Sequence, residues 1–269
     1  MISFVVYAHS SRLANLNQMI RFIEAREKAL AGSEILLVVQ DGCPTVNSRL
    51  FEVHQFNLQM SSYCKPLMCN LGVGQAKHEI VSLLDSDRIL PPGYFHRVCS
   101  NLQRRQFVTT KFIRKLSGSH TDQQIQQDCF RSYKTEERSE LLRPRMKNLF
   151  SGNTTFYKAD YLPMDERYVG YGFADNDASR TVLEAGGEAI YLPETEIHLH
   201  HPVSVFIDGV EIRSFKIVSA INAMIYAEKW KIRDAEINKL CCEVVEELDA
   251  YPEEFHESFM KRFRKLRLF

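Results

Sequence analysis

The sequence predicts an α/β fold with a mostly parallel central sheet, because strand-like and helix-like segments alternate along its first hundred residues. Residues 2–8 (ISFVVYA) and 34–44 (EILLVVQDGCP) each hold a short apolar run that is typical of a buried strand. Between them, Leu13, Leu16 and Ile20 recur at helical spacing. This alternation favours a parallel sheet flanked by helices.

The third predicted strand lies within residues 81–95 (VSLLDSDRILPPGYF) and ends in two carboxylates before a Pro-Pro stop. A helix that begins within residues 72–81 precedes it. Ligands bind at the carboxyl ends of the strands in sheets of this kind. We therefore expect Asp41, Asp85 and Asp87 at the binding edge of the sheet.

The second half of the chain predicts a return to the fold after a long connection. Residues 115–148 are polar and charged with little periodicity, which indicates a loop that is either functional or mobile. Strand-like and turn-like patterns resume over residues 149–205, and a helical pattern follows. We expect one main domain over residues 1–205 and a C-terminal helical appendage over residues 206–269.

Composition limits the class of protein. The 269 residues are 45% hydrophobic and 25% charged, which is ordinary for a soluble globular protein. The formal net charge of +0 gives no argument for a nucleic-acid partner. The seven cysteines are odd in number and form no CxxC pair, and no basic leader precedes the first apolar run. These features predict free thiols and a cytoplasmic protein.

Asp85 and Asp87 form a D-x-D pattern at a strand end, where both side chains can turn toward one cation. Carboxylate oxygens suit hard divalent ions such as Mg²⁺ and Mn²⁺. Solvated surface acids are the alternative interpretation, and the commoner one for this pattern taken alone. The segment IHLHHP adds His198, His200 and His201 at another strand end, and imidazoles beside carboxylates favour Mn²⁺ over Mg²⁺.

The run RYVGYGFADNDAS, residues 167–179, places two carboxylates beside glycines and aromatic residues. Desolvating a carboxylate costs free energy unless a partner compensates for it. A half-buried acid in this run therefore predicts a functional role, and Asp175 is the first acid after the glycines.

Taken in order, these motifs resemble those of a GT-A-fold glycosyltransferase of the family 2 type, with a galactosyltransferase C-terminal-type module. VVQDG, NLGVGQAKHE and LLDSD match the nucleotide-sugar half, over residues 1–100. The segment from FSGN to HLHHP matches the acceptor and metal half, over residues 149–205. Residues 115–148 are long, polar and rich in both charges, and they join the two halves, so we expect an acceptor-side loop that is at least partly mobile without ligand.

The resemblance also implies roles for single residues. Asp41 would hydrogen-bond the uracil of a UDP-sugar, Lys77 would bind the nucleotide, and Asp85 would hold ribose or metal. The metal would be Mn²⁺ or Mg²⁺, bound by Asp87 and by His198 with His201 second.

In the acceptor half, Asp175 falls at the position of the catalytic base in inverting members. The residues expected to contact the donor or acceptor sugar are Gly152, Asn153, Tyr171, Gly172, Phe173 and Asp177. Ala174 departs from the family pattern, which often has Glu there, and this departure puts the identity of the acceptor in doubt.

The expected function is an inverting, metal-dependent transfer of a hexose or N-acetylhexosamine, with galactose-type sugars favoured. UDP-sugar would be the donor, and a glycan or lipid-linked oligosaccharide the acceptor, in bacterial surface polysaccharide synthesis. Two alternatives stay open. One is a catalytically silent sugar-binding or scaffold protein, and the other is a glycoside hydrolase that uses paired carboxylates.

The end of the chain carries an apolar stripe within a basic segment. Phe255, Phe259, Phe263 and Leu266 recur at helical spacing, and residues 255–269 have five Lys or Arg against one Glu. A basic amphipathic helix can lie in an anionic membrane interface, which would place the protein at the inner face of the plasma membrane. The alternative is that this helix packs on the domain.

Overall fold

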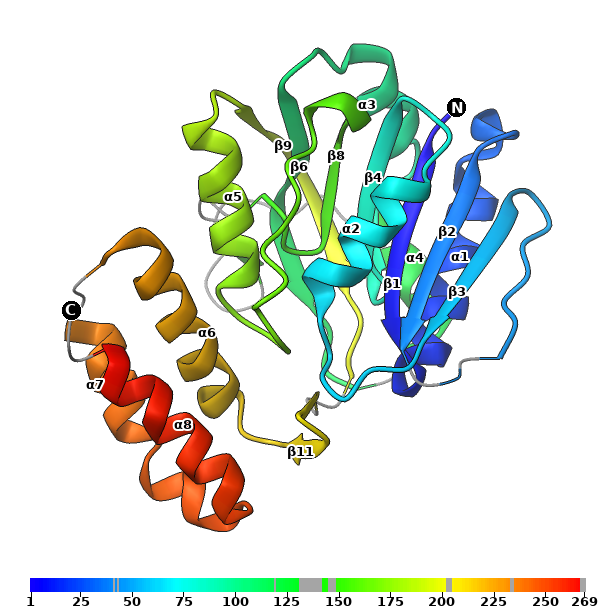
Figure 1. Ribbon diagram of the computed structural model, residues 1–269. Helices are drawn as coiled ribbons and strands as arrows, with labels where there is room; N and C mark the ends of the chain where they lie inside the picture. The colour runs from blue at the N-terminus through cyan, green and yellow to red at the C-terminus, as the bar shows by residue number, and fades with distance from the viewer. Residues whose placement is uncertain are drawn as a thin grey trace.

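The computed structural model describes most of the chain (Figure 1). The described residues are 1–40, 42, 44–118, 120–130, 142–144, 149–201, 205–232 and 235–266. In this part of the chain, one large sheet has helices on both faces, and three helices at the C-terminal end pack side by side against one flank (Figure 1). The predicted α/β architecture is confirmed.

The first half of the sheet is parallel, in the order β3-β2-β1-β4. The strands are β1 (Ser3–His9), β2 (Glu34–Gln40), β3 (Glu52–Leu58) and β4 (Ile80–Asp85). All seven residues of β2 are buried, because helices cover both faces of a parallel sheet and leave no solvated side. Asp85 is the last residue of β4, so it lies at the carboxyl edge of these strands.

The second half of the sheet is mixed, so antiparallel pairs join the predicted parallel ones. Strand β8 is antiparallel to both β4 and β6, whereas β6 and β9 are parallel. The short strands β5 and β7 add antiparallel pairs to β9 and β6. Their bounds are β5 (Arg88–Ile89), β6 (Gln106–Lys115), β7 (Leu142–Pro144), β8 (Asn153–Tyr157) and β9 (Glu188–His198).

Alternation along the strands divides the core into two hydrophobic clusters, one on each face. Val5 and Leu36 belong to one cluster, and their neighbours Phe4 and Leu37 belong to the other. Helices α1 (Leu13–Arg26) and α3 (Tyr94–Asn101) cover the second face. Helices α2 (Lys65–Gln75) and α5 (Ala174–Glu184) cover the first. The single-turn helices are η1 (Ser10–Arg12), η2 (Lys28–Leu30), η4 (Lys158–Asp160) and η5 (Glu246–Ala250).

Helix α2 lies close to β1 because of a glycine. A Cβ on Gly72 would lie 2.3 Å from Cγ1 of Val5, nearer than two carbon atoms can approach. Gly72, the first glycine of the segment GVGQA, therefore serves helix–strand packing in this fold.

The segment 115–148 is not a single loop. Helix α4 (Asp122–Phe130) and strand β7 lie within it, and Ile125 of α4 is fully buried. The helix escaped prediction because its other turns are polar. Residues 131–141 and 145–148, on which the expectation of mobility also bears, lie outside the described residues.

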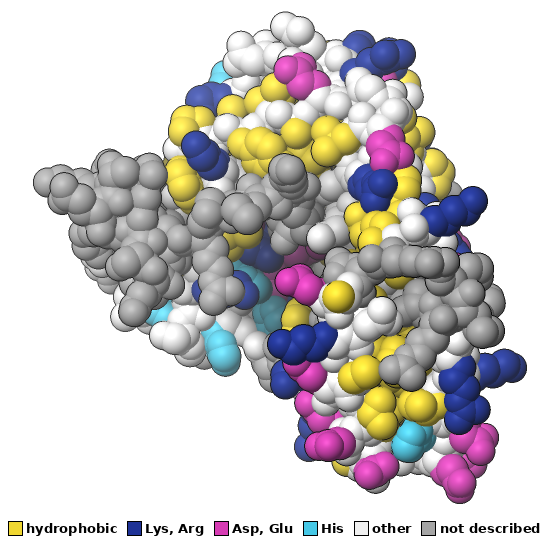
Figure 2. Space-filling model, turned by 90° about the vertical axis from the view of Figure 1, so that its left-hand side faces the viewer, with side chains coloured by type: hydrophobic (Ala, Val, Ile, Leu, Met, Phe, Trp, Pro, Cys, Tyr) yellow, Lys and Arg dark blue, Asp and Glu magenta, His cyan; other side chains and the backbone are white. Residues whose placement is uncertain are grey.

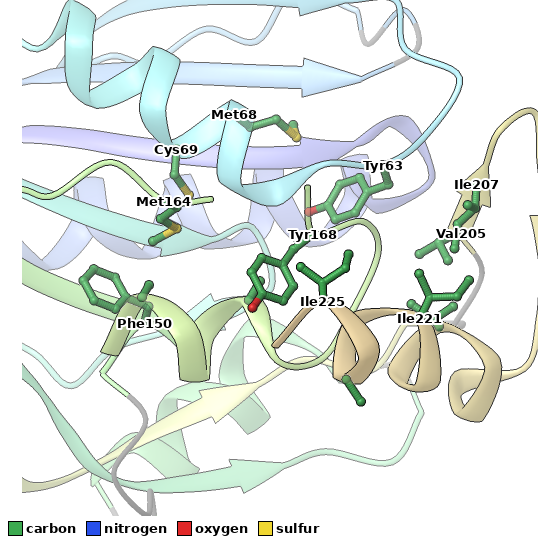
Figure 3. Packing of buried hydrophobic residues seen from close by; sticks show 14 of the residues in the cluster. Tyr63, Met68, Cys69, Phe150, Met164, Tyr168, Val205, Ile207, Ile221 and Ile225 are labelled. Atoms are coloured by element: carbon green, nitrogen blue, oxygen red, sulfur yellow. The ribbon is translucent and has the colours of Figure 1, made fainter. Parts of the chain in front are cut away.

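The C-terminal helices share a hydrophobic cluster with the sheet. They are α6 (Phe215–Trp230), α7 (Ala235–Glu243) and α8 (Glu253–Leu266), preceded by the hairpin of β10 (Val205–Ile207) and β11 (Val210–Ile212). Figure 3 shows Ile221 and Ile225 of α6 facing the side of the cluster that holds Val205, Ile207 and Tyr63. The extension is thus continuous with the core.

The apolar stripe of α8 is part of this core, which corrects the expectation that it lies in a membrane interface. Phe255, Phe259 and Phe263 are buried in the same cluster as α6, so they are not available to lipid. Lys261 and Arg262 remain exposed. None of the helices in the described ranges combines the length and the hydropathy that a membrane crossing needs.

Candidate active site

A cavity of about 310 Å³ opens at the carboxyl end of β4. Three segments that are distant in the sequence line it: the D-x-D turn, the end of β9, and the loop before α5. Figure 2 shows acidic, basic and histidine side chains gathered around a hollow in this face of the molecule. A cavity therefore lies at the edge of the sheet where the sequence predicted a binding site.

Strand pairing brings the D-x-D turn to the histidine cluster. Arg88 of β5 pairs with His198 of β9, so Asp87 comes beside His198 and His201. Oδ2 of Asp87 lies 3.5 Å from Nε2 of His198 and 3.0 Å from Nε2 of His201. One ligand atom from each residue lies within 4.8 Å of the others. His200 is exposed and does not belong to this group.

This donor set fits a divalent metal ion. One carboxylate oxygen and two imidazole nitrogens suit Mn²⁺ better than Mg²⁺. Burial and the charge of Arg88 lower the pKa of His198, which favours the neutral imidazole that a metal requires. Burial alone would raise the pKa of Asp87, but hydrogen bonds from His198 and His201 and nearby arginines hold it well below its usual range.

Asp85 turns away from the histidines. Its Oδ1 accepts a hydrogen bond from the hydroxyl of Tyr7 and lies 3.3 Å from Nζ of Lys65. Its Oδ2 lies 3.4 Å from Nη2 of Arg88. Burial raises the pKa of Asp85, but the charges of Lys65 and Arg88 outweigh it and lower the pKa. Asp85 is thus an ionised carboxylate on the wall of the cavity, outside the Asp87–His198–His201 group.

Asp175 lies in the first turn of α5 and also lines the cavity. Its Oδ1 lies 2.6 Å from Nζ of Lys65, which is the first residue of α2. Nζ also donates a hydrogen bond to the carbonyl oxygen of Phe150 at 2.9 Å. Burial would lower the pKa of Lys65, but the charges of Asp175 and Asp85 raise it above its usual value. Lys65 is therefore a charged, buried link between the two carboxylates.

The loop before α5 is held by α6. The side-chain amide of Asn222 donates to the carbonyl oxygens of Val169, Tyr171 and Gly172, and its Oδ1 accepts from the backbone of Val169. A Cβ on Gly170 would lie 2.6 Å from a methyl group of Val218. The glycines are thus required by packing against α6, in addition to any approach to sugar.

Phe173 closes this loop with a φ of 55°, which is uncommon for an aromatic residue. Its ring packs on Tyr226 of α6 at a centroid distance of 5.5 Å. A backbone in this region persists only where surrounding contacts determine it. Contacts with α6 therefore fix where α5 begins, and with it the position of Asp175.

The remaining predicted sugar contacts divide into two groups. Tyr171 and Gly172 line the cavity. Asp177 is buried and binds Nζ of Lys229 and the indole of Trp230, both at 2.7 Å, so it anchors α5 to α6. Asn153 is buried and hydrogen-bonds Glu196, Thr110 and Tyr94.

Gly152 is packed against the same buried network. A Cβ at this position would lie 2.5 Å from Oε1 of Glu196 and 3.0 Å from Nε of Arg88. Gly152 and Asn153 thus support the wall of the cavity rather than line it.

Lys77, one of the predicted nucleotide contacts, does not line the cavity. Lys77 precedes β4, at the opposite edge of the sheet from Asp85, and its Nζ pairs with Glu52 at 2.6 Å and Glu34 at 3.7 Å. This position does not fit a nucleotide contact in the cavity. Asp41 lies outside the described residues.

Sequence reasoning missed three cations of the site. Arg12, Lys65 and Arg88 are all less than 10% exposed and all line the cavity. A charge inside an apolar segment was the available signal for Lys65, which stands in YCKPLM, and for Arg88, which follows the D-x-D pattern. Arg12 gave no such signal, because it lies in a polar stretch.

The sequence model of the family described as "Glycosyltransferase like family 2" matches residues 14–264. The chain therefore belongs to the glycosyltransferase-like family 2. Among curated proteins, none matches this chain.

Two examples come from the solved structures that resemble this chain. One is "Crystal structure of GalNAc-T7 with UDP, GalNAc and Mn2+", which is 14% identical in sequence with a TM-score of 0.57. The matched region covers 98% of this chain and 55% of the GalNAc-T7 chain. The other is "Crystal structure of S. aureus TarS 1-349", which is 13% identical in sequence with a TM-score of 0.49. The matched region covers 89% of this chain and 68% of the TarS chain. The likeness to GalNAc-T7 confirms the GT-A fold, and this chain spans about half the length of that protein.

Proposed function

We propose that this protein is an inverting, metal-dependent glycosyltransferase that uses a UDP-sugar. The donor sugar would be a hexose or N-acetylhexosamine, and the acceptor a hydroxyl of a glycan or lipid-linked oligosaccharide of the bacterial surface. The observation that carries the proposal is that Asp87, His198, His201 and Asp175 line one cavity. The GalNAc-T7 structure contains UDP, GalNAc and Mn²⁺, which supports this donor and metal class.

The metal half of the site has a defined chemical task. Asp87, His198 and His201 would hold Mn²⁺, which supplies positive charge beside the diphosphate as negative charge grows on the leaving group. The cavity excludes much of the solvent from these residues, since Asp87 is only 1% exposed. Electrostatic interactions are stronger in such a partly desolvated site.

The acceptor half would move a proton. Asp175 would accept the proton of the acceptor hydroxyl as its oxygen attacks the anomeric carbon and the bond to UDP breaks. Lys65 holds Asp175 in place through their ion pair, and the ionised form of an aspartate is the one that can take a proton. Direct attack by the acceptor, without a covalent intermediate, gives a product whose anomeric configuration is opposite to that of the donor.

Calorimetric titration of UDP, with Mn²⁺ and with EDTA, tests the nucleotide and metal assignments in the wild type and in Asp87→Asn. The proposal predicts tight binding only for the wild type with Mn²⁺. Equal affinity in all four conditions would contradict the metal site. Thermal-shift screening of nucleotide sugars then selects the donor. A donor that binds but is never transferred would favour the sugar-binding scaffold protein, and release of the sugar to water alone would favour a hydrolase.

A further inference from the structure

Arg12 contacts the same oxygen atom that the two histidines surround. It is the last residue of η1, directly after β1, and its side chain is 8% exposed. Its Nη1 donates a hydrogen bond to Oδ2 of Asp87 at 2.9 Å. His198 and His201 also present their Nε2 atoms to this Oδ2. A guanidinium cation thus lies at the corner of the Asp87–His198–His201 group.

A metal ion and Arg12 cannot both bind Oδ2 of Asp87 without a cost in free energy. Two cations that share one carboxylate oxygen in a buried site repel each other strongly, because little solvent screens them. Asp87 would keep another partner if Arg12 moved, since Nε of Arg88 lies 3.2 Å from its Oδ1. Arg12 is therefore the cation of this group whose contact a metal would replace.

The rest of the Arg12 side chain is suited to an anionic ligand. Its Nη2 is buried and has no hydrogen-bond partner among the described residues, and the side chain lines the cavity. Its guanidinium carbon lies 5.2 Å from the ring centre of Tyr171. The planar guanidinium presents several donors in a fixed fork, which matches the oxygens of a phosphate group.

We infer that Arg12 is an internal counterion for the metal site. It neutralises Asp87 while no metal is bound, and it turns to the diphosphate of the donor when a metal takes its place. Metal and nucleotide then bind cooperatively, because the diphosphate supplies the negative charge that Arg12 loses. This inference rests on the proposed function, since it assumes that Asp87 binds a metal beside a nucleotide diphosphate.

Arg12→Gln isolates the charge, because glutamine retains a hydrogen-bond donor for Asp87. We expect its dissociation constant for Mn²⁺ alone to fall by roughly tenfold or more, measured from the electron paramagnetic resonance signal of free Mn²⁺. At saturating Mn²⁺, its dissociation constant for UDP should rise by about tenfold in calorimetry, because a charged phosphate partner is lost. General damage to the site would weaken both ligands, so the opposite signs are diagnostic.

Three further variants complete the test. Arg12→Lys retains the charge and should bind Mn²⁺ nearly as the wild type does. Arg12→Met removes the charge and the hydrogen bond, and it should also bind Mn²⁺ more tightly if Arg12→Gln fails to fold. Arg21→Met is the matched control, because Arg21 is 55% exposed on α1 and pairs with Asp122. It should leave both dissociation constants unchanged.

The outcomes separate this inference from the proposed function. If the wild type and Asp87→Asn bind no Mn²⁺, with or without UDP, the metal site and the role of Arg12 are both wrong. If the wild type binds Mn²⁺ through Asp87 but Arg12→Gln and Arg12→Met bind it no more tightly, only the counterion role is overturned. Tighter Mn²⁺ binding with weaker UDP binding establishes it.

Discussion

Nζ of Lys65 lies 2.6 Å from Oδ1 of Asp175, and this ion pair joins the N-terminal ends of helices α2 and α5. Lys65 is 90% buried and Asp175 is about three-quarters buried, so solvent screens the pair only in part. Asp85 lies 3.3 Å from the same Nζ. Lys65 therefore connects the carboxylate of the D-x-D turn to the proposed base.

Removing this lysine should destabilise the fold. Lys65→Met leaves two largely buried carboxylates without their shared cation, which costs about 3 kcal/mol in comparable buried pairs. We expect the free energy of unfolding in urea to fall by about that amount. Lys65→Arg should recover part of it. Lys239→Met is the control, since Lys239 is 78% exposed and its variant should unfold like the wild type. A Lys65→Met protein of unchanged stability would show that the pair is not coupled.

Replacing Asn222 should disturb the loop before α5 and leave nucleotide binding intact. Asn222→Ala removes the buried amide that donates to the carbonyl oxygens of Val169, Tyr171 and Gly172, so stability should fall by about 1–3 kcal/mol. Turnover should fall as well, because this loop precedes Asp175. Calorimetry should give an unchanged dissociation constant for UDP with Mn²⁺. A large loss of UDP affinity would mean that α6 also supports the metal half.

The histidines should differ in their effect on metal binding. His198→Ala and His201→Ala each remove a nitrogen that faces Asp87, so the dissociation constant for Mn²⁺ should rise by about tenfold or more. His200→Ala is the matched control, because His200 is exposed and lies outside the Asp87–His198–His201 group. Titration of each variant with Mn²⁺ decides the matter. Loss of Mn²⁺ binding in His200→Ala alone would show that the wrong imidazoles were assigned.

The last helix should behave as part of the core. Phe259 is 2% exposed, so Phe259→Ala should lower the free energy of unfolding by about 3–5 kcal/mol. Replacing the exposed Lys261, Arg262 and Arg264 with Gln should change it little. Urea denaturation distinguishes the two variants. A fully stable Phe259→Ala protein would return α8 to the membrane-interface interpretation.

Local patterns predicted much of the fold. The apolar runs of β1, β2 and β4 are continuous because both faces of a parallel sheet are buried, and such runs are readable from sequence. The antiparallel insertion of β8 between β4 and β6 was not readable, because strand direction depends on the path of the chain. The stripe of α8 illustrates the same limit. An apolar helix face shows that something covers it. The spacing of its apolar residues is the same whether that cover is lipid or another helix such as α6.

The candidate site was predictable where function leaves a short motif. Asp87, His198 and His201 converge as the D-x-D and HLHHP segments implied. Asp177 and Asn153 are polar residues within the predicted sugar-binding segments. In the structure they stabilise the packing of α5 and β8 instead. Lys77 is closer in sequence to the D-x-D motif than Lys65 is. Strand β4 separates Lys77 from the motif, so this lysine lies at the far edge of the sheet. Partners contributed by distant elements, such as Asn222, leave no local pattern.

The most direct test of the account is the turnover of Asp175→Asn with the selected donor and an acceptor. Asparagine keeps the shape of the side chain and removes its basic oxygen. General base catalysis contributes roughly 10²- to 10⁴-fold, so we predict that kcat falls by about that factor while the dissociation constant for UDP hardly changes. UDP release measured under saturating donor and acceptor gives the result. An Asp175→Asn enzyme that turns over at the wild-type rate would contradict the assignment of Asp175 as the base and with it the single-displacement mechanism.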